Sequence, residues 1–337
     1  MSLNRLDLGN SGIQATPLGF GCATLSRASD PAQRSRLLQA AYDAGIRHFD
    51  VAPMYGLGRA EPELGSFTRR HRSDVTIATK FGIRPTLAAR GLAYAQRPVR
   101  RAFESKPTIR DQARTHAAAP SRLLYDKSGY DVGGARRSLH RSLRTLKTDY
   151  VDLLLLHDPH PGSVRSEEVS SFLEDARAAG LIRSWGIAGA PETTIEVAQS
   201  FAWVPVLQLQ DDVFVRSLRH APVGSAFITF GVISRALGRI VQHVRADEST
   251  RFRWESIIGA DCGDPDTTSS FLLRSALQAN SSGVVLFGAT RLSHIGTAVV
   301  ALEKHLSPAS DKSDIGSFMS LVNAELCGPT AAERRGI

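Results

Sequence analysis

Short apolar runs alternate along the chain with longer segments in which apolar residues recur at every third or fourth position. Short runs of this kind are typical of buried strands, and the periodic segments are typical of amphipathic helices. From residue 17 onward there are eight strand candidates, with helical segments after most of them. The strand candidates are residues 17–21, 46–50, 75–80, 150–157, 184–188, 204–210, 226–230 and 284–287.

This alternation favours a parallel sheet, and the count of eight predicts an α/β fold of the (β/α)8 TIM barrel type. A doubly wound open sheet is the alternative, but no Gly-x-Gly-x-x-Gly segment opens the first helix. Residues 5–16 predict an N-terminal β-hairpin around a Gly-Asn-Ser-Gly turn. Residues 82–129 interrupt the alternation and are expected to form an extended loop over the rim or a partly mobile lid, and residues 231–263 are expected to be a second irregular rim segment that contains helical pieces. We expect residues 1–337 to form a single domain.

The composition allows a full hydrophobic core, because 42% of the 337 residues are apolar and 22% are charged. No run of 18 apolar residues and no charged-then-apolar leader is present, so we expect a soluble, cytoplasmic protein without membrane partners. Cys22, Cys262 and Cys327 lie far apart and show neither a metal-binding spacing nor a disulfide framework, so no metal site is expected.

Much of the net charge of +8 lies in residues 97–122 and in a helix predicted over residues 134–146. Leu139, Leu143 and Leu146 mark the apolar face of that helix, and its arginines lie largely off this face. We interpret the arginines as a solvated surface. Nucleic-acid binding through residues 97–122 is the alternative, but no zinc-finger spacing or aromatic RNA-binding pattern supports it.

Titratable side chains stand at the ends of three predicted strands. Asp50, Lys80 and His157 are each the last residue of their strand, and Tyr55 follows Asp50 in a loop marked by proline and glycine. Each could serve structure alone, as a turn, packing or solvated residue. Together they fit a barrel, because parallel strands bring their carboxyl ends to one rim, where barrels place their chemistry.

These four groups suit proton transfer to or from an oxygen. A phenol has a pKa near 10, and an adjacent ammonium favours the phenolate and lowers that pKa. Lys80 can be that ammonium, Asp50 can hold it by an ion pair, and His157 can orient a substrate oxygen. The site suits protonation of a carbonyl oxygen while hydride arrives at carbon, or the reverse. Hydride chemistry needs a cofactor, since side chains cannot supply it.

Five segments resemble one known family. They are GIRHFDVAPMYGLGRAEPELG, TIATKFG, SLRTLKTDYVDLLLLHDPH, SWGIAGAP and VVLFGATRLSHI, and they span almost the whole chain. The family is that of the aldo-keto reductases, NAD(P)-dependent oxidoreductases on a (β/α)8 barrel. By this resemblance Asp50, Tyr55, Lys80 and His157 fall on the catalytic tetrad, with Tyr55 as general acid/base. DVAPMYGLG, YDKSGYD and LLLLHDPH look most like the branch that includes aldose and galactose 1-dehydrogenases and pyridoxal dehydrogenase.

The resemblance also implies cofactor contacts. Where the family often has Ser-Asn for the nicotinamide amide, this chain has Ala188-Gly189, so the backbone must serve. Gln208 matches the other amide ligand, and Phe214 could replace a stacking aromatic. The family's Glu-Asn for adenine is replaced by Thr297-Ala298. The full set of implied contacts is Gly21, Asp50, Ala188, Gly189, Gln208, Phe230, Gly231, Gly288, Ala289, Thr290, Arg291 and His294.

The sequence thus predicts an NAD(P)-dependent oxidoreductase that interconverts a carbonyl and an alcohol, or a sugar hemiacetal and a lactone, on a small polar substrate. The alternative is a regulatory barrel that binds the cofactor with little or no turnover, which the altered amide-binding pair and the long basic insert favour. Arg291 or His294 could meet a 2′-phosphate, and the positive charge favours NADP over NAD. Oligomeric state, reaction direction and substrate identity stay open.

Overall fold

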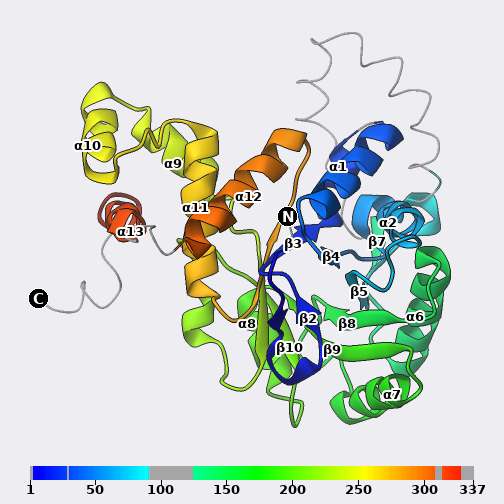
Figure 1. Ribbon diagram of the computed structural model, residues 1–337. Coiled ribbons are helices and arrows are strands. Elements are labelled where there is room, and N and C mark those ends of the chain that lie inside the picture. Colours follow the sequence, from blue (N-terminus) through cyan, green and yellow to red (C-terminus); the bar gives the residue numbers. More distant parts are fainter. Residues whose placement is uncertain (1–2, 29, 90, 92–123, 308–312, 328–337) are drawn as a thin grey trace, which may run out of the picture.

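The computed structural model describes residues 3–28, 30–89, 91, 124–307 and 313–327 (Figure 1). Eight parallel strands form a closed barrel, which confirms the predicted (β/α)8 fold. In barrel order the strands are β3 (Leu18–Gly21), β4 (His48–Asp50), β5 (Thr76–Phe81), β8 (Val151–His157), β9 (Ile182–Gly189), β10 (Val206–Gln210), β11 (Ala226–Phe230) and β12 (Val284–Phe287).

Helices surround the barrel and connect most of its strands (Figure 1). They are α1 (Pro31–Asp43), α2 (Ala60–Thr68), α6 (Val132–Leu146), α7 (Ser166–Ala178), α8 (Pro191–Ala198), α9 (Ala236–Val244), α10 (Glu248–Ile258), α11 (Pro265–Ala279), α12 (Leu292–Leu306) and α13 (Ser313–Leu326). Aspartate side chains cap four of these helices by accepting backbone N–H bonds in the first turn, at Asp30, Asp131, Asp247 and Asp264. Among the described helices, none is long and apolar enough to cross a bilayer.

The predicted N-terminal hairpin is present as β1 (Leu6–Asp7) paired antiparallel with β2 (Gln14–Ala15). Its buried Leu8 and Ile13 join the side chains that fill the barrel interior. A Cβ on Gly9 would lie 2.8 Å from the Cβ of Ala226, the first residue of β11. The hairpin therefore closes the end of the barrel where the strands begin and leaves the opposite rim free for a site.

The two segments that interrupt the alternation contain short elements of their own. Residues 231–263, expected as an irregular stretch with helical pieces, carry the helices α9 and α10, which pack with α11 and α13 around the buried Trp254. Between β10 and β11 there is only a short 3₁₀ helix, η4 (Ser217–His220). The predicted rim loop 82–129 begins and ends in a two-stranded ribbon, β6 (Arg84–Pro85) with β7 (Tyr125–Asp126). The rest of that loop, residues 90 and 92–123, lies outside the described residues.

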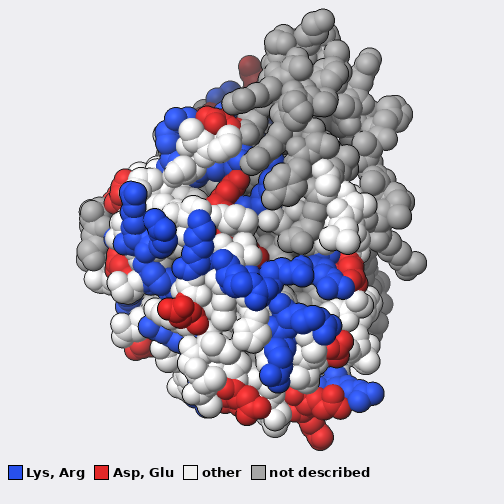
Figure 2. Space-filling view, turned by 90° about the vertical axis from the view of Figure 1, so that its right-hand side faces the viewer, with Lys and Arg blue, Asp and Glu red and all other residues white. Residues whose placement is uncertain are grey.

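The face of the molecule that carries α6 is rich in basic side chains, which spread across it in a band (Figure 2). Arg136, Arg137, Arg141 and Arg144 of α6 are all exposed, as expected for side chains off the apolar face. Residues 97–122, the other basic segment, lie outside the described part of the chain. That nucleic acid is not a partner stays a prediction.

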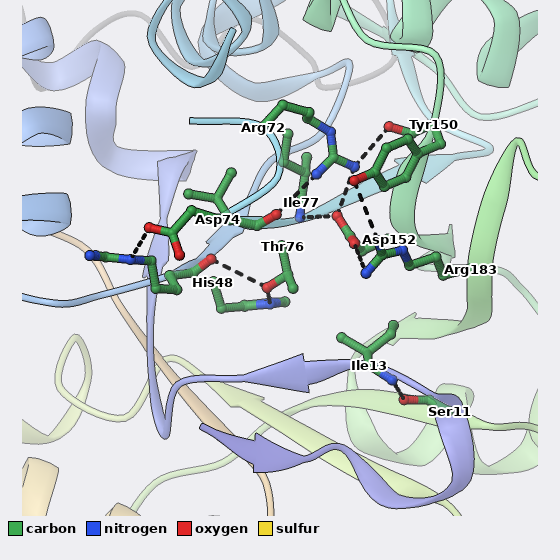
Figure 3. A network of polar contacts seen from close by, with 12 residues as sticks. Ser11, Ile13, His48, Arg72, Asp74, Thr76, Ile77, Tyr150, Asp152 and Arg183 are labelled. Carbon is green, nitrogen blue, oxygen red and sulfur yellow. Dashed lines mark hydrogen bonds and ion pairs between the residues drawn. The ribbon is translucent and has the colours of Figure 1, made fainter. Parts of the chain in front are cut away.

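A network of buried polar groups ties together the starts of three barrel strands (Figure 3). Asp152, at the start of β8 and 1% exposed, accepts hydrogen bonds from Arg72 Nη2 and from the Ile77 N–H of β5, each at 2.8 Å. Arg183, at the start of β9, lies 3.3 Å from the second carboxylate oxygen. Both guanidinium groups also pack over the Tyr150 ring. The network locks β5, β8 and β9 at the end of the barrel remote from the predicted site.

Candidate active site

A buried ion pair lies at the carboxyl ends of β4 and β5. Lys80 Nζ donates to Asp50 Oδ1 at 2.6 Å and to the Val51 carbonyl at 3.1 Å, and both charged side chains are at most 3% exposed. Gln208 of β10 reaches across the barrel and donates to the same Asp50 oxygen at 2.9 Å. Because Asp50 is held from two sides, its carboxylate fixes the position of the ammonium.

Tyr55 stands over this pair. It opens the 3₁₀ helix η3 (Tyr55–Leu57), and the centre of its ring lies 4.9 Å from Lys80 Nζ. The His157 ring, at the end of β8, meets the Tyr55 ring edge-on with 5.8 Å between ring centres. Gly56 adopts a left-handed conformation, with φ of 59°, so that the chain can turn sharply after the tyrosine. The structure thus brings Asp50, Tyr55, Lys80 and His157 to one rim, as the sequence analysis expected.

The pKa of Tyr55 departs from the expectation. Burial raises it, and the charge of Lys80 and its hydrogen bond to the phenol lower it, but burial wins and the pKa rises to about 12. The expectation that Lys80 would bring the phenol toward neutrality considered only the charge and omitted desolvation. In this structure Tyr55 is therefore a protonated phenol at neutral pH, ready to donate.

His157 is a neutral imidazole. Burial lowers its pKa well below the usual range, and the positive charges of Lys80 and Lys127 lower it further. Its Nδ1 is buried and has no hydrogen-bond partner among the described residues. The backbone of His157 is held instead by Tyr130, whose hydroxyl donates to the carbonyl of His157 at 2.7 Å and to that of Asp158 at 3.0 Å. Tyr130 was not singled out by the sequence analysis as a site residue.

The four groups border a cleft of about 1170 Å³. Most of the expected cofactor contacts line it, namely Gly21, Asp50, Ala188, Gly189, Gln208, Phe230, Gly231, Gly288, Thr290 and His294. Ala289 and Arg291 do not: Ala289 is fully buried in the core, and Arg291 is an exposed residue just before α12. Phe214 is also absent from the lining and packs beneath Arg239.

Several lining residues were missed from sequence, including Thr24, Arg27, Asp158 and Asp266. Thr24 and Arg27 belong to a 3₁₀ helix, Asp158 to a loop and Asp266 to the first turn of α11, so the rule that located the tetrad at strand ends could not locate them. In the described part of the chain, no three His, Cys, Asp or Glu side chains gather as metal ligands.

Comparison with known proteins decides the family. The model of the Aldo/keto reductase family matches residues 17–215, which is more than half of the chain. This chain belongs to the aldo/keto reductase family. The match covers the strands that carry Asp50, Lys80, His157 and Gln208, together with the Tyr55 loop.

Curated aldo/keto reductases and related enzymes are similar over part of their length. The chain is 33% identical over 184 residues to D-threo-aldose 1-dehydrogenase of a Pseudomonas species, covering 52% of this chain and 51% of that protein. It is 32% identical over 196 residues to pyridoxal 4-dehydrogenase of Microbacterium luteolum, covering 53% and 54%. The chain therefore spans about half the length of these relatives. These matches confirm the resemblance to the aldose and pyridoxal dehydrogenase branch.

Solved structures of aldo/keto reductases share the fold over almost the whole chain. Glycerol dehydrogenase from Gluconobacter oxydans is 15% identical, with a TM-score of 0.67, and covers 98% of both chains. An aldo-keto reductase from Klebsiella pneumoniae, solved with NADPH, is 18% identical, with a TM-score of 0.66, and covers 98% of this chain and 97% of its own. At this identity the likeness supports the shared barrel alone.

Proposed function

We propose that this aldo/keto reductase is an NAD(P)-dependent oxidoreductase that interconverts a carbonyl and an alcohol, with Tyr55 as general acid/base. The observation that carries the proposal is the convergence of a protonated phenol, a buried ammonium and a neutral imidazole at one end of a 1170 Å³ cleft. This set can place a proton on, or take one from, a single oxygen. The nicotinamide, when bound, supplies or accepts the hydride at the adjacent carbon.

Each side chain has a distinct role in the proposed reaction. In reduction, the Tyr55 hydroxyl gives its proton to the carbonyl oxygen, and the positive charge of Lys80 stabilises the phenolate that is left. Asp50 holds Lys80 in place through the 2.6 Å ion pair. His157, being neutral, offers one N–H that can orient the oxygen before the proton moves.

The lining of the cleft fits a dinucleotide. Gln208 Oε1 is buried and accepts no hydrogen bond from the residues that the structure describes, which leaves an acceptor for an amide N–H at the cleft wall. Ala188 and Gly189 line the cleft without bulky side chains. A Cβ on Gly288 would lie only 2.5 Å from Thr24 Oγ1, so a glycine is needed for these two segments of the cleft wall to lie this close together. We propose that these residues hold the nicotinamide and the adjoining phosphates.

The charged residues at the end of the cleft away from Tyr55 bear on the choice between NAD and NADP. The nicotinamide must reach Tyr55, so the rest of the dinucleotide extends toward the lining residues of α11 and α12. Asp266 of α11 lines this side, whereas the lysines and arginine that line the cleft in the described part of the chain, Lys80, Lys127 and Arg27, lie outside both helices. A carboxylate hydrogen-bonds ribose hydroxyls and repels a 2′-phosphate. We therefore propose NAD as the preferred cofactor, in contrast to the NADP that overall charge favoured.

For the substrate we propose a small aldose or aldehyde. The curated relatives are named as dehydrogenases of D-threo-aldoses and of pyridoxal, which are small polar molecules with an aldehyde or hemiacetal carbon. With a sugar hemiacetal the reaction would run as an oxidation: a deprotonated Tyr55 would take the proton of the anomeric hydroxyl, and the anomeric carbon would lose a hydride to the oxidised nicotinamide, which gives a lactone.

A direct assay tests the function. The purified protein is mixed with NAD or NADP, or their reduced forms, and with a panel of aldoses and aldehydes, and the near-ultraviolet absorbance of the reduced nicotinamide is followed. We expect turnover with at least one aldose or aldehyde and a kcat/KM at least tenfold higher with NAD. Saturable cofactor binding without turnover across the panel would instead support the regulatory barrel. If the protein instead prefers NADP, we expect the 2′-phosphate to be bound by Arg291 or by Arg245, which lines an adjoining groove.

A further inference from the structure

Arg27 is an exposed arginine at the mouth of the cleft. It is the last residue of the 3₁₀ helix η2 (Cys22–Arg27), which follows β3; it is exposed, and it lines the cleft. Its neighbour Ser26 packs closely on Gly56, since a Cβ on that glycine would lie 2.9 Å from the Ser26 Cβ. Gly56 directly follows Tyr55, so Arg27 belongs to the end of the cleft where the proton is transferred.

Two carboxylates that bind residues just after Arg27 are already engaged. Asp30 caps α1 and lies 3.8 Å from Arg36, and Glu63 pairs with the buried Arg34 at 2.8 Å. Arg34 also donates to the Ala28 carbonyl at 2.6 Å, which fixes the backbone just after Arg27. Within the described part of the chain, Arg27 itself forms no ion pair or hydrogen bond.

The other cations of the cleft are neutralised. Lys80 pairs with Asp50 at 2.6 Å, and Lys127 pairs with Asp158 at 2.8 Å. Arg27 is therefore the uncompensated positive charge among the described residues at the Tyr55 end. A guanidinium presents several N–H donors in a planar fork that matches a carboxylate or a phosphate.

We propose that Arg27 determines substrate specificity by binding an anionic group, a carboxylate or a phosphate ester, on the substrate carbonyl compound. The inference rests on the proposed function and adds a substrate class to it: acidic aldehydes and acidic sugars rather than neutral ones. The anionic group would sit at the mouth, beside Arg27, while the carbonyl oxygen lies deeper at Tyr55. The ion pair orients the substrate and excludes neutral analogues that leave the guanidinium unpaired.

A phosphate of the cofactor is the other source of an anionic group for Arg27. Within η2, Thr24 lies against the proposed cofactor contact Gly288, whereas Ser26, next to Arg27, lies against Gly56 beside Tyr55, and this position of Arg27 favours the substrate. Cofactor affinity measured without substrate separates the two sources.

The test uses matched neutral and anionic probes: galactose against galacturonate, and butyraldehyde against succinic semialdehyde. We expect kcat/KM to be at least tenfold higher for the anionic member of a pair, mainly through KM, and the ratio to fall at high salt because the pair is exposed. Arg27→Gln should reduce that ratio about tenfold, Arg27→Lys should retain part of it, and Arg27→Glu should reverse it. Arg36→Gln, which changes an arginine of α1 outside the cleft lining, is the matched control and should leave the ratio unchanged.

Calorimetric titration of the cofactor-loaded protein with each probe gives a readout that does not depend on turnover. Tighter binding of the anionic probes that Arg27→Gln abolishes supports the inference even if no probe is turned over, in which case the proposed function fails and the anion site stands. Equal affinity for neutral and anionic probes, or a preference that survives Arg27→Gln, overturns it. A tenfold loss of cofactor affinity in Arg27→Gln with an unchanged probe ratio also overturns it and assigns Arg27 to a cofactor phosphate.

Discussion

The two ends of the barrel bury charge in different ways. Where the strands begin, both oxygens of Asp152 face a guanidinium, Arg72 on one side and Arg183 on the other, and the network lies on the closed side of the barrel (Figure 3). Where the strands end, Lys80 and Asp50 are as deeply buried, but the groups around them face a cleft. Among the described residues, buried atoms without a hydrogen bond occur at both ends, but His157 and Gln208, which carry Nδ1 and Oε1, line the cleft, whereas Asp152 and His48, which carry Oδ1 and Nε2 at the closed end, do not.

This difference indicates that the closed end contributes mainly to stability and the open end mainly to catalysis. Removing one member of a buried ion pair lowers the stability of the fold, because the remaining charge is left buried and uncompensated. Buried donors and acceptors without partners are rare in folded proteins unless a ligand or water uses them. We therefore expect substitutions at the closed end to lower the free energy of unfolding, and substitutions at the open end to lower turnover.

The largest effect is expected at Tyr55. Tyr55→Phe removes the proton donor while keeping the ring against His157, so kcat should fall by about 10²- to 10⁴-fold, the range of a general acid/base. The melting temperature and the cofactor dissociation constant should change little, and both can be measured on the same preparation. Turnover within twofold of the wild type would refute the role given to Tyr55.

At the closed end, Asp152→Asn should lower the free energy of unfolding by about 4 kcal/mol, because Arg72 loses a charged partner while largely buried. Denaturant unfolding measures this loss, and kcat/KM at a temperature where the variant is folded should stay within twofold of the wild type. Asp149→Asn, an exposed aspartate three residues earlier, is the control for the loss of one charge. If Asp152→Asn instead left stability intact and lowered turnover, the proposed division between the two ends would be wrong.

A pH dependence of stability is expected from His48, which opens β4 near the closed end. Burial lowers its pKa to about 4, and its Nδ1 lies 2.9 Å from Thr76 Oγ1. The unfolded chain binds a proton below pH 6.5 and the folded chain does not until about pH 4, so stability from this group is present above pH 6.5 and is lost as pH falls toward 4. The full loss is about 3 kcal/mol.

His48→Asn isolates this contribution, since asparagine does not titrate and can keep the bond to Thr76. The stability advantage of the wild type over the variant should shrink between pH 7 and pH 4, and denaturant melts at each pH measure it. Comparison with the variant removes the carboxylates, which titrate in both proteins. An advantage that is constant with pH would mean that His48 is accessible to protons in the folded state.

The barrel could be predicted from the sequence, and so could the placement of Asp50, Tyr55, Lys80 and His157 at one rim, because strand ends can be located from local patterns. It could not find contacts that join distant segments, such as Tyr130 with His157 or the pairing of β6 with β7 across the long insert. The pKa of Tyr55 was predicted in the wrong direction, since charge is visible in a sequence and burial is not.

Tyr130 offers the finest test of the comparison, because it supports the open end without belonging to the tetrad. Gly82, at φ of 106°, leaves room for its ring, and its hydroxyl holds the carbonyls of His157 and of Asp158, a residue in the left-handed region with φ of 49°. Tyr130→Phe removes that hydroxyl and releases the end of β8. We expect kcat to fall about tenfold, equivalent to about 1.4 kcal/mol, with KM for cofactor nearly unchanged.

The matched control lies at the other end of the same strand. Tyr150 directly precedes β8, and its hydroxyl receives a 3.4 Å contact from Arg183. Tyr150→Phe also removes one hydroxyl beside β8, but it should leave kcat unchanged and affect the melting temperature alone. Equal losses of melting temperature in the two variants, with a loss of kcat confined to Tyr130→Phe, would show that Tyr130 positions His157. Parallel changes in both variants would reduce Tyr130 to a structural residue and blur the distinction between the two ends of the barrel.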